Sequence, residues 1–563
     1  MRTSIIENGW VAEFVISFKT LRFPEAPTQD FGLNMVRRTR RTNEDSTWTP
    51  LPLRITSITR TPFAGRLTGF EGIRQGRNLK VKPFGIGSFA QNGVADTRKG
   101  DGDAGFDVKF GITPKLTFDA TFRTDFSQVE ADEQQVNLTR FNILFPEKRE
   151  FFLENSGLFQ IASTPQETVN ILPFFSRRIG LSAAGTPIPI LGGARLSGRA
   201  SGFDVGALAM KTRDDGDPGT GGFVPSNNFL VGRIRRDILG MHSVGVIMTS
   251  RDSDRAGDYS RTYGADTRLR FFDRRLDIAS YILSTDSSKD RGRGHNAKLL
   301  GAAWRDDHLS VVAQYETVDP DFQPEVGFVR RSAMTHVDTE ISWTQQMVTS
   351  SWLRNISGSG RVDNYDGPTG DVESRAHTAS GGIELQNGSN INVGMVNAFE
   401  RLARPFALRP TVILPVGDYE FLRYTVSGNT DLSRAISGSA NASAGDFWSG
   451  TSKAVSGTVT FRPNHHFNVA ATLNTTAARL PEGDFTATVI GTRFQIGFSP
   501  RMSLGSFVQY NSTTKQFTSN TRFNFLHRPL SDLFVVYNER RDTTSHALID
   551  RALIVKFTNL FDF

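Results

Sequence analysis

Three glutamates, Glu147, Glu150 and Glu154, recur at helical spacing. Residues three or four apart lie on the same face of a helix, and a pair of neighbouring carboxyl groups is what glycosidases use to cleave a sugar bond. Two cations, Lys148 and Arg149, stand between them. Acids beside cations commonly form structural ion pairs. We therefore interpret the group as an ion-paired structural cluster and predict no catalytic residue.

A second basic pair, Arg177-Arg178, follows further along the chain, and we expect it to meet those glutamates. We find no nucleophile elbow, no phosphate loop and no histidine pair at helical spacing. His465 and His466 are adjacent, so on a strand they point to opposite faces and do not readily share a metal. The chain has no cysteine, which excludes thiol catalysis and Cys-ligated zinc. The sequence predicts no cofactor and no metal site.

Apolar and polar residues alternate along much of the chain. In residues 106–112, Phe106, Val108 and Phe110 are separated by Asp107 and Lys109. A tight turn follows at residues 113–115, and residues 116–126 alternate in the same way. A period of two places the two sets on opposite faces of a strand. In a membrane barrel the apolar face meets lipid and the polar face lines the lumen.

Similar strands recur to the end of the chain, joined alternately by short turns and longer loops, as in outer-membrane barrels. We count about 24 strands, within about two, between Asn78 and Asn559. The predicted fold is all-β, a large antiparallel transmembrane β-barrel. The terminal Phe563 resembles the aromatic signal that barrel-insertion machinery reads. The alternative is a water-soluble protein of several sandwiches, in which the apolar faces pack against each other.

Composition agrees with a barrel. No stretch approaches the roughly 18 consecutive apolar residues of a membrane helix, and mean hydropathy is only -0.31. The net charge of +7 arises from 65 basic and 58 acidic residues, which are dispersed, so we predict no nucleic-acid partner. The expected surroundings are outer-membrane lipid and lipopolysaccharide. No secretory signal peptide is visible at Met1, so we expect this chain to be part of a longer precursor.

One long segment, residues 127–186, lacks clean alternation. Long segments of this kind in compact folds usually have a function, and barrels of about 22 strands carry a plug. We predict that this segment folds into the lumen as a plug, with its arginines and glutamates paired.

The same segment carries a family resemblance. The motifs are DFSQVEADEQQVNLTRFNILFPEKREFFLENSGLF, FFSRRIGL and IPILGGARLSGR. They resemble the domain of unknown function 5916 family, over about Pro50 to Phe563. The resemblance implies an outer-membrane barrel of Gram-negative bacteria, preceded by a domain similar to carbohydrate-binding module family 9.

The N-terminal residues fit that picture. NGWVAEFVISFKTLRFP and FGLNMVRRTRRTNE look like the last strands of such a module. We predict an incomplete, periplasmic β-sandwich at residues 1–49 and the barrel at residues 50–563. By alternation Trp10, Phe14, Ile16 and Phe18 are expected in the sandwich core. Trp10 and Trp48 are the candidates for carbohydrate binding.

Three functions remain open from the sequence. The first is a barrel that passes or tethers a glycan or another solute at the cell envelope. The second is a carbohydrate-active hydrolase associated with the sugar-binding module. The third is a structural or assembly role in the outer membrane.

Overall fold

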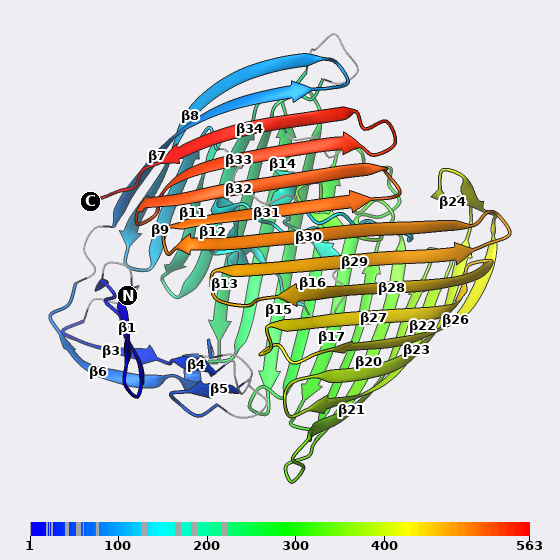
Figure 1. The fold of residues 1–563 in the computed structure, drawn as a ribbon, viewed down its shortest axis with the longest axis horizontal. Coiled ribbons are helices and arrows are strands. Elements are labelled where there is room, and N and C mark those ends of the chain that lie inside the picture. The colour runs from blue at the N-terminus through cyan, green and yellow to red at the C-terminus, as the bar shows by residue number, and fades with distance from the viewer. Residues whose placement is uncertain are drawn as a thin grey trace.

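The computed structural model describes residues 2–18, 21, 23, 26–39, 44–51, 58–59, 61–74, 78–124, 132–163, 170–181, 188–216 and 223–563. Over these residues 24 long strands form one closed antiparallel barrel (Figure 1). The predicted fold and strand number are confirmed. In the part of the chain that is described, no helix has both the length and the apolar character needed to cross a membrane.

The strands of the wall follow one another in chain order. They are β7 (Leu79–Asn92), β8 (Thr97–Thr113), β9 (Leu116–Phe122), β11 (Ile190–Ala200), β12 (Phe203–Thr212), β13 (Asn227–Ile238), β14 (His242–Ser253), β15 (Tyr259–Phe271), β16 (Leu276–Ser287), β17 (Asn296–Arg305), β18 (Leu309–Val318), β20 (Met334–Gln346), β21 (Leu353–Asp366), β22 (Val372–Leu385), β23 (Asn390–Leu402), β26 (Gly417–Asn429), β27 (Ile436–Phe447), β28 (Gly450–Phe461), β29 (Phe467–Arg479), β30 (Phe485–Ser499), β31 (Met502–Asn511), β32 (Gln516–Arg528), β33 (Ser531–Asp542) and β34 (Leu548–Thr558).

The barrel closes between its first and last strands. β34 pairs antiparallel with β7, with Ala552 opposite Ala90. A short strand, β35 (Phe561–Asp562), continues the pairing along β7, and the backbone N–H of Phe563 donates to the carbonyl of Leu79 at 2.9 Å. Closure leaves no sheet edge, and this is the condition for a sheet to lie in hydrocarbon, where unpaired backbone groups cost several kcal/mol.

The apolar face of the wall points outward. On β9, Phe122 is 41% exposed at the outer surface, whereas the inward Thr117, Asp119 and Thr121 are buried. On β14, Val246 is exposed outside while its neighbour Ile247 is buried inside. A soluble sandwich would show the opposite arrangement. The outer surface therefore suits lipid, as in a transmembrane barrel.

The two ends of the barrel differ. β7 begins and β34 ends at the same end, at the left of Figure 1, and we call it the turn end. At the opposite, loop end lie the longer connections. These include the segment between β9 and β11, the connection between β18 and β20, and a hairpin of β24 (Phe406–Arg409) and β25 (Val412–Leu414).

Three small two-stranded sheets precede the barrel. They pair β1 (Arg2–Ile6) with β2 (Gly9–Glu13), β3 (Thr28–Leu33) with β6 (Gly65–Glu71), and β4 (Val36–Thr39) with β5 (Glu44–Thr47); a short 3-10 helix, η2 (Thr61–Phe63), lies before β6.

Four rings pack together here, those of Phe18, Phe23, Phe31 and Phe70. Of the four predicted core residues, Phe18 is packed in this group, but the expectation is wrong for Trp10, Phe14 and Ile16, because all three are more than half exposed. The reason is that β2 pairs only with β1 and no other described sheet pairs with this hairpin. The predicted sandwich and the division of the chain at residue 49 stay predictions.

The direction of the two faces can be tested on neighbouring residues. Leu473 lies at the middle of β29 and faces outward, 39% exposed, while Asn474 faces the lumen. We expect Leu473→Lys to destabilise the barrel in lipid vesicles by about 2–4 kcal/mol, because it places a cation in hydrocarbon. Asn474→Lys, the matched control, is expected to change stability little. Denaturant unfolding in vesicles, followed by heat-modifiable gel mobility, measures both, and equal stabilities would contradict a lipid-facing Leu473.

Candidate functional site

The segment between β9 and β11 enters the lumen from the loop end. Its described residues, 132–163 and 170–181, contain α1 (Glu150–Leu153), η3 (Ser156–Phe159), β10 (Ile171–Leu172) and η4 (Ser176–Arg178). β10 pairs with β19 (Phe328–Val329), which belongs to the connection between β18 and β20. The predicted plug at 127–186 is described in these parts, while residues 127–131, 164–169 and 182–186 lie outside the described residues. We call residues 132–181 the insert.

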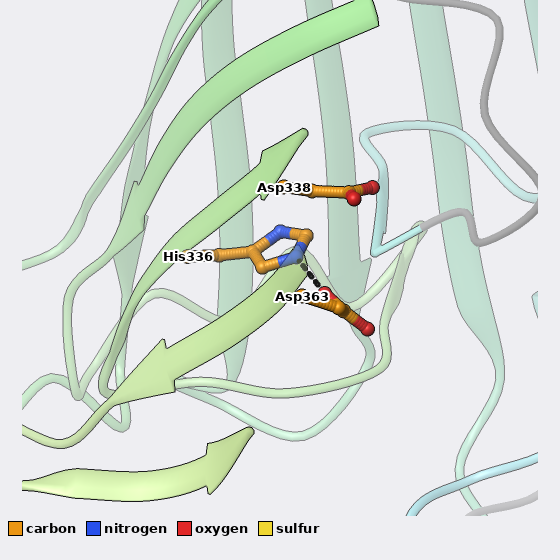
Figure 2. Close-up of side chains that lie close together, drawn as sticks. All are labelled: His336, Asp338 and Asp363. Atoms are coloured by element: carbon orange, nitrogen blue, oxygen red, sulfur yellow. Dashed lines mark hydrogen bonds and ion pairs between the residues drawn. The ribbon is translucent and has the colours of Figure 1, made fainter. Parts of the chain in front are cut away.

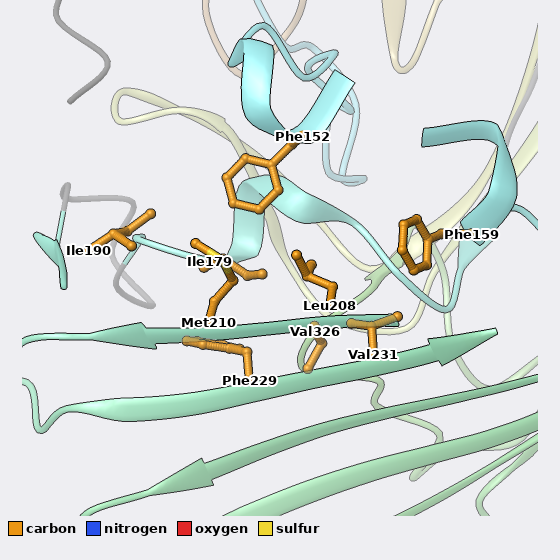
Figure 3. Close-up of a cluster of buried hydrophobic side chains, with 9 residues drawn as sticks. All are labelled: Phe152, Phe159, Ile179, Ile190, Leu208, Met210, Phe229, Val231 and Val326. Carbon is orange, nitrogen blue, oxygen red and sulfur yellow. The ribbon is translucent and has the colours of Figure 1, made fainter. Parts of the chain in front are cut away.

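An apolar cluster packs the insert onto the wall. Phe152, Phe159 and Ile179 of the insert lie over the inward side chains of β12 and β13 (Figure 3). The wall residues of this cluster are Ile190, Leu208, Met210, Phe229 and Val231, and Val326 joins them from the connection after β18. A wholly polar lumen was therefore the wrong expectation for this half of the barrel. The signal in the sequence is that Phe229, Leu230 and Val231 are all apolar, because alternation then makes both faces of β13 apolar at this point.

Arg195 on β11 fastens the insert to the wall. Its side chain is 3% exposed, and one guanidinium nitrogen lies 2.9 Å from a carboxylate oxygen of Asp119 on β9. It also donates to the backbone carbonyls of Glu154, at 2.7 Å, and Phe151. The Glu154 carboxylate in turn pairs with Lys109 of β8. Such a group holds firmly only when every member is paired, because an unpaired buried charge is costly.

Glu147 and Arg149 form a second pair within the insert. Two hydrogen bonds of 2.8 and 2.7 Å join the guanidinium to the carboxylate, and Ser176 donates its hydroxyl to Glu147 at 2.6 Å. Arg149 also donates to the carbonyl of Ile179 at 2.8 Å. Burial tends to raise the pKa of Glu147, but the bonds from Arg149 and Ser176 outweigh it and hold that pKa below its usual 4.5. These bonds of Glu147 therefore hold η4 next to the residues just before α1.

The paired arginines at η4 do not meet these glutamates as expected. Arg177 binds Asp132, which also takes Lys148 at 3.1 Å. Arg178 donates to the backbone carbonyl of Gly327 at 3.2 Å. The difference has a simple reason: both oxygens of Glu147 are already bonded to Arg149, and the fold brings Asp132 against Arg177. Although burial tends to raise the pKa of Asp132, the two cations keep it lowered.

The first part of the insert, residues 132–141, crosses the lumen, and we call it the strap. At one side Gln134 donates its backbone N–H to the side chain of Gln509 on β31 at 2.7 Å. At the other side Arg140 lies 3.0 Å from the Glu400 carboxylate on β23 and 3.2 Å from the Ser374 hydroxyl on β22. The strap thus links parts of the wall that are far apart around the barrel.

A polar cluster around His336 holds the later part of the insert. The Asn170 amide donates to Nδ1 of His336 at 3.1 Å and to Glu316 of β18 at 2.7 Å. On the other side of the ring, Nε2 lies 2.6 Å from Asp363 on β21, and the Tyr365 ring stacks on the imidazole with centroids 4.0 Å apart. Glu316 also lies 3.6 Å from Nδ1, so the imidazole is held between two carboxylates, and Asn170 bridges the ring to one of them.

Sequence reasoning missed this cluster, because its members lie on separate strands and match no motif. His336, Asp338 and Asp363 place their ligand atoms within 4.8 Å of one another (Figure 2), a grouping that could hold a metal ion. Each of the three already has a protein partner: Asp338 accepts two 2.9 Å bonds from Arg361, and Asp363 accepts from His336. The geometry supports a buried anchor of the insert.

The other sequence candidates lie apart from the lumen cluster. Trp10 and Trp48 are 57% and 54% exposed in the small N-terminal sheets, and the Arg37 guanidinium lies 5.7 Å from the Trp10 ring centroid. Phe563 is at the turn end, next to β7. A role for either tryptophan in sugar binding, and for Phe563 in insertion, stays a prediction.

Comparison with known proteins adds one family. Residues 77–189 match the domain of unknown function (DUF5916). This confirms the predicted resemblance over that range. The DUF5916 match runs from the start of β7 to the start of β11, so the matched range takes in three strands of the wall and the insert. No curated protein matches this chain.

Solved structures with a related architecture are distant. The copper transporter OprC has 10% identity and a TM-score of 0.41, and the match covers 89% of this chain and 83% of that one. The FrpB iron transporter from Neisseria meningitidis (F3-3 variant) has 9% identity and a TM-score of 0.38, and the match covers 87% of this chain and 82% of that one. Pseudomonas aeruginosa OpdO has 10% identity and a TM-score of 0.29, and the match covers 86% of this chain and 97% of that one. Likenesses this distant carry no inference about what the chain binds.

The anchoring role of Arg195 is testable. We expect Arg195→Gln to loosen residues 149–160 by about 3 kcal/mol, since it leaves Asp119 buried without its guanidinium. The control is Arg540→Gln, because Arg540 pairs with Asp550 while half-exposed, and exposed pairs contribute about 1 kcal/mol or less. Amide hydrogen exchange in detergent micelles measures the protection of residues 149–160 in both variants. Unchanged protection of residues 149–160 in the Arg195 variant would rule out this anchor.

The pKa shifts predict an acid dependence. A carboxyl group with a lowered folded-state pKa stabilises the fold above its usual pKa, and this contribution is lost as pH falls through the lowered value. For Glu147 and Asp132 the loss begins below about 4.5 and 3.8, their usual values. We expect exchange protection factors in the insert to fall between pH 5 and pH 3.

Glu147→Gln is expected to lower this protection already at pH 7 and to flatten its pH dependence. Glu133→Gln, at an exposed residue of the same segment, is the control and is expected to leave both unchanged. Equal pH profiles for wild type and Glu147→Gln would contradict the assignment.

Proposed function

We propose that this chain is a bacterial outer-membrane barrel whose lumen passes or retains a solute, with the insert as its plug. The observation that supports this most directly is the uneven filling of the lumen. The insert packs onto the wall from β9 to β18, and its strap reaches across to β22, β23 and β31. The inner wall between β23 and β29 carries polar residues that are half-buried or exposed to water.

The orientation follows from the two ends. The turn end, with its short connections and both barrel termini, faces the periplasm in this proposal, and the loop end faces outward. The N-terminal sheets then lie on the periplasmic side. Lipid and lipopolysaccharide contact the outer surface, the insertion machinery reads Phe563, and a glycan is one solute that the lumen would take.

The strap is the part that is suited to move. It is attached mainly by hydrogen bonds and ion pairs at Asp132, Gln134 and Arg140, with Leu138 as its one side chain packed on an apolar cluster among the described residues. By contrast, α1 and η3 are held by an apolar core and by Arg195. Segments with few buried apolar contacts open at the lowest free energy. Release of the strap would widen the path along β23–β29 while the rest of the insert stays in place.

Conductance across a planar lipid bilayer tests the proposal. We expect the wild-type barrel to conduct weakly and a variant with residues 132–163 replaced by a short Gly-Ser linker to conduct several-fold more, because the lumen is cleared. A folded, heat-modifiable deletion barrel that conducts no ions would refute the proposal.

A second variant tests the role of the strap without deleting any residues, so the test does not depend on whether the deletion variant folds. Gln134→Cys with Gln509→Cys places the chain's first two thiols at residues whose contact spans the length of the Gln509 side chain, so a short, reducible bis-thiol cross-linker is used to join them. We expect cross-linking to suppress channel openings and reduction to restore them. Openings that are the same before and after cross-linking would show that the strap does not gate the lumen.

A further inference from the structure

Two rows of side chains cross the inner wall on β23, β26, β27, β28 and β29. Each row joins residues that stand directly opposite one another on neighbouring strands. The first row is Asn392, Ser427, Asn441, Ser456 and Asn474. The second row is Asn390, Asn429, Ser439, Thr458 and Thr472. All ten are asparagine, serine or threonine, and we call them the ladder.

The ladder faces the lumen. The residues next to it along the strands, Ile391, Val426, Val455 and Leu473, are exposed on the outer surface, and alternation turns the ladder inward. The ten residues line one recess of about 520 Å³, where they meet Glu133 of the strap. The recess therefore lies between the open wall and the segment that crosses the lumen.

Most of the ladder has hydrogen-bonding capacity to spare. In the second row, Asn390 donates to Asn429 at 2.6 Å, and in the first row Asn392 donates to Asn390 at 3.3 Å. The side chains of Ser427, Asn441, Ser456 and Asn474 bond to no other described residue. An amide offers two donors and an acceptor, and a hydroxyl is both donor and acceptor. The row thus presents both kinds of group to whatever occupies the recess.

The absence of charge on the ladder selects a class of ligand. On the opposite wall, inward residues such as Asp119, Arg195 and Arg233 are charged, and each forms an ion pair with another residue of the wall. A neutral amide or hydroxyl can replace its hydrogen bonds to water with hydrogen bonds to a ligand hydroxyl. No ion is desolvated in this exchange, whereas desolvation is the main cost when a charged group binds a ligand. An uncharged ligand rich in hydroxyls matches the ladder, whereas an anionic ligand would find no counter-charge on it and would meet the carboxylate of Glu133 in the same recess.

The spacing suits an extended ligand. Neighbouring strands are roughly 4.8 Å apart, so five strands offer a hydrogen-bonding group at each step over roughly 19 Å. We propose that the ladder is a binding surface for an uncharged, linear, polyhydroxylated solute, of which an oligosaccharide chain is the natural representative. This inference rests on the proposed function to the extent that the ligand must enter the lumen.

Saturation-transfer NMR on the full chain in detergent micelles tests the site, with maltohexaose as the neutral probe and hexagalacturonate as its charged counterpart. Wild type and the variant with residues 132–163 replaced by a linker, which we call the strap-deleted barrel, are both titrated. We expect transfer to maltohexaose and little to hexagalacturonate. Asn441→Asp is expected to weaken maltohexaose binding by roughly fivefold to tenfold, because it puts a carboxylate in the middle of the first row.

Ser342→Asp is the matched control. Ser342 faces the lumen from β20, beside Ser310 and Ser359 and away from the ladder, and its substitution is expected to leave maltohexaose binding unchanged. Equal binding by wild type and Asn441→Asp, or equal transfer to the two probes, would overturn the inference.

The bilayer measurement separates this inference from the proposed function. If the strap-deleted barrel conducts but shows no preference for maltohexaose, the ladder is not the binding surface, and the proposed passage of a solute through the lumen is unaffected. A barrel that never conducts, yet binds maltohexaose and loses it in Asn441→Asp, refutes passage and leaves the ladder standing as a retention site.

Discussion

Backbone hydrogen bonding in hydrocarbon is the constraint on which the rest of this structure depends. Each N–H and C=O at membrane depth needs a partner within the protein, and the pairing of β34 with β7 provides it by leaving the barrel sheet without an edge. Closing 24 strands encloses a lumen too wide for the wall's own side chains to fill. What occupies the lumen therefore distinguishes this barrel from others of similar size.

The lumen is divided into two unlike halves. From β9 to β18 the inner wall behaves like half of a soluble core, with apolar clusters around Phe152 and Phe322 and with buried ion pairs such as Arg233–Asp266. From β23 to β29 it carries neutral amides and hydroxyls in contact with water toward the turn end. Toward the loop end of the same strands, an apolar cluster that includes Leu402, Phe447 and Trp448 packs against the β24–β25 hairpin. The strap is the only part of the described insert that reaches β31 by hydrogen bonds. The lumen is thus filled by packed side chains along one part of the wall and is open to water along the other part.

Alternation predicted the barrel because strand geometry is local, and the first and last strands begin and end within a residue of the predicted Asn78 and Asn559. The partners of the insert were not predictable in this way. Arg177 pairs with Asp132 instead of the nearby glutamates, and the His336 cluster gathers residues from β18, β20, β21 and the insert. Trp10 was misplaced because alternation does not say whether a second sheet covers a strand.

The sequence by itself determined which residues share a face of each strand, since successive side chains point to opposite sides whatever the surroundings. Only the tertiary structure decided what each face meets. Gln134 and Gln509 are 375 residues apart in the chain and in contact in the lumen, and the ladder exists only because the register aligns five strands. Such contacts depend on chain closure and on the path of the insert, and neither is encoded in any local period.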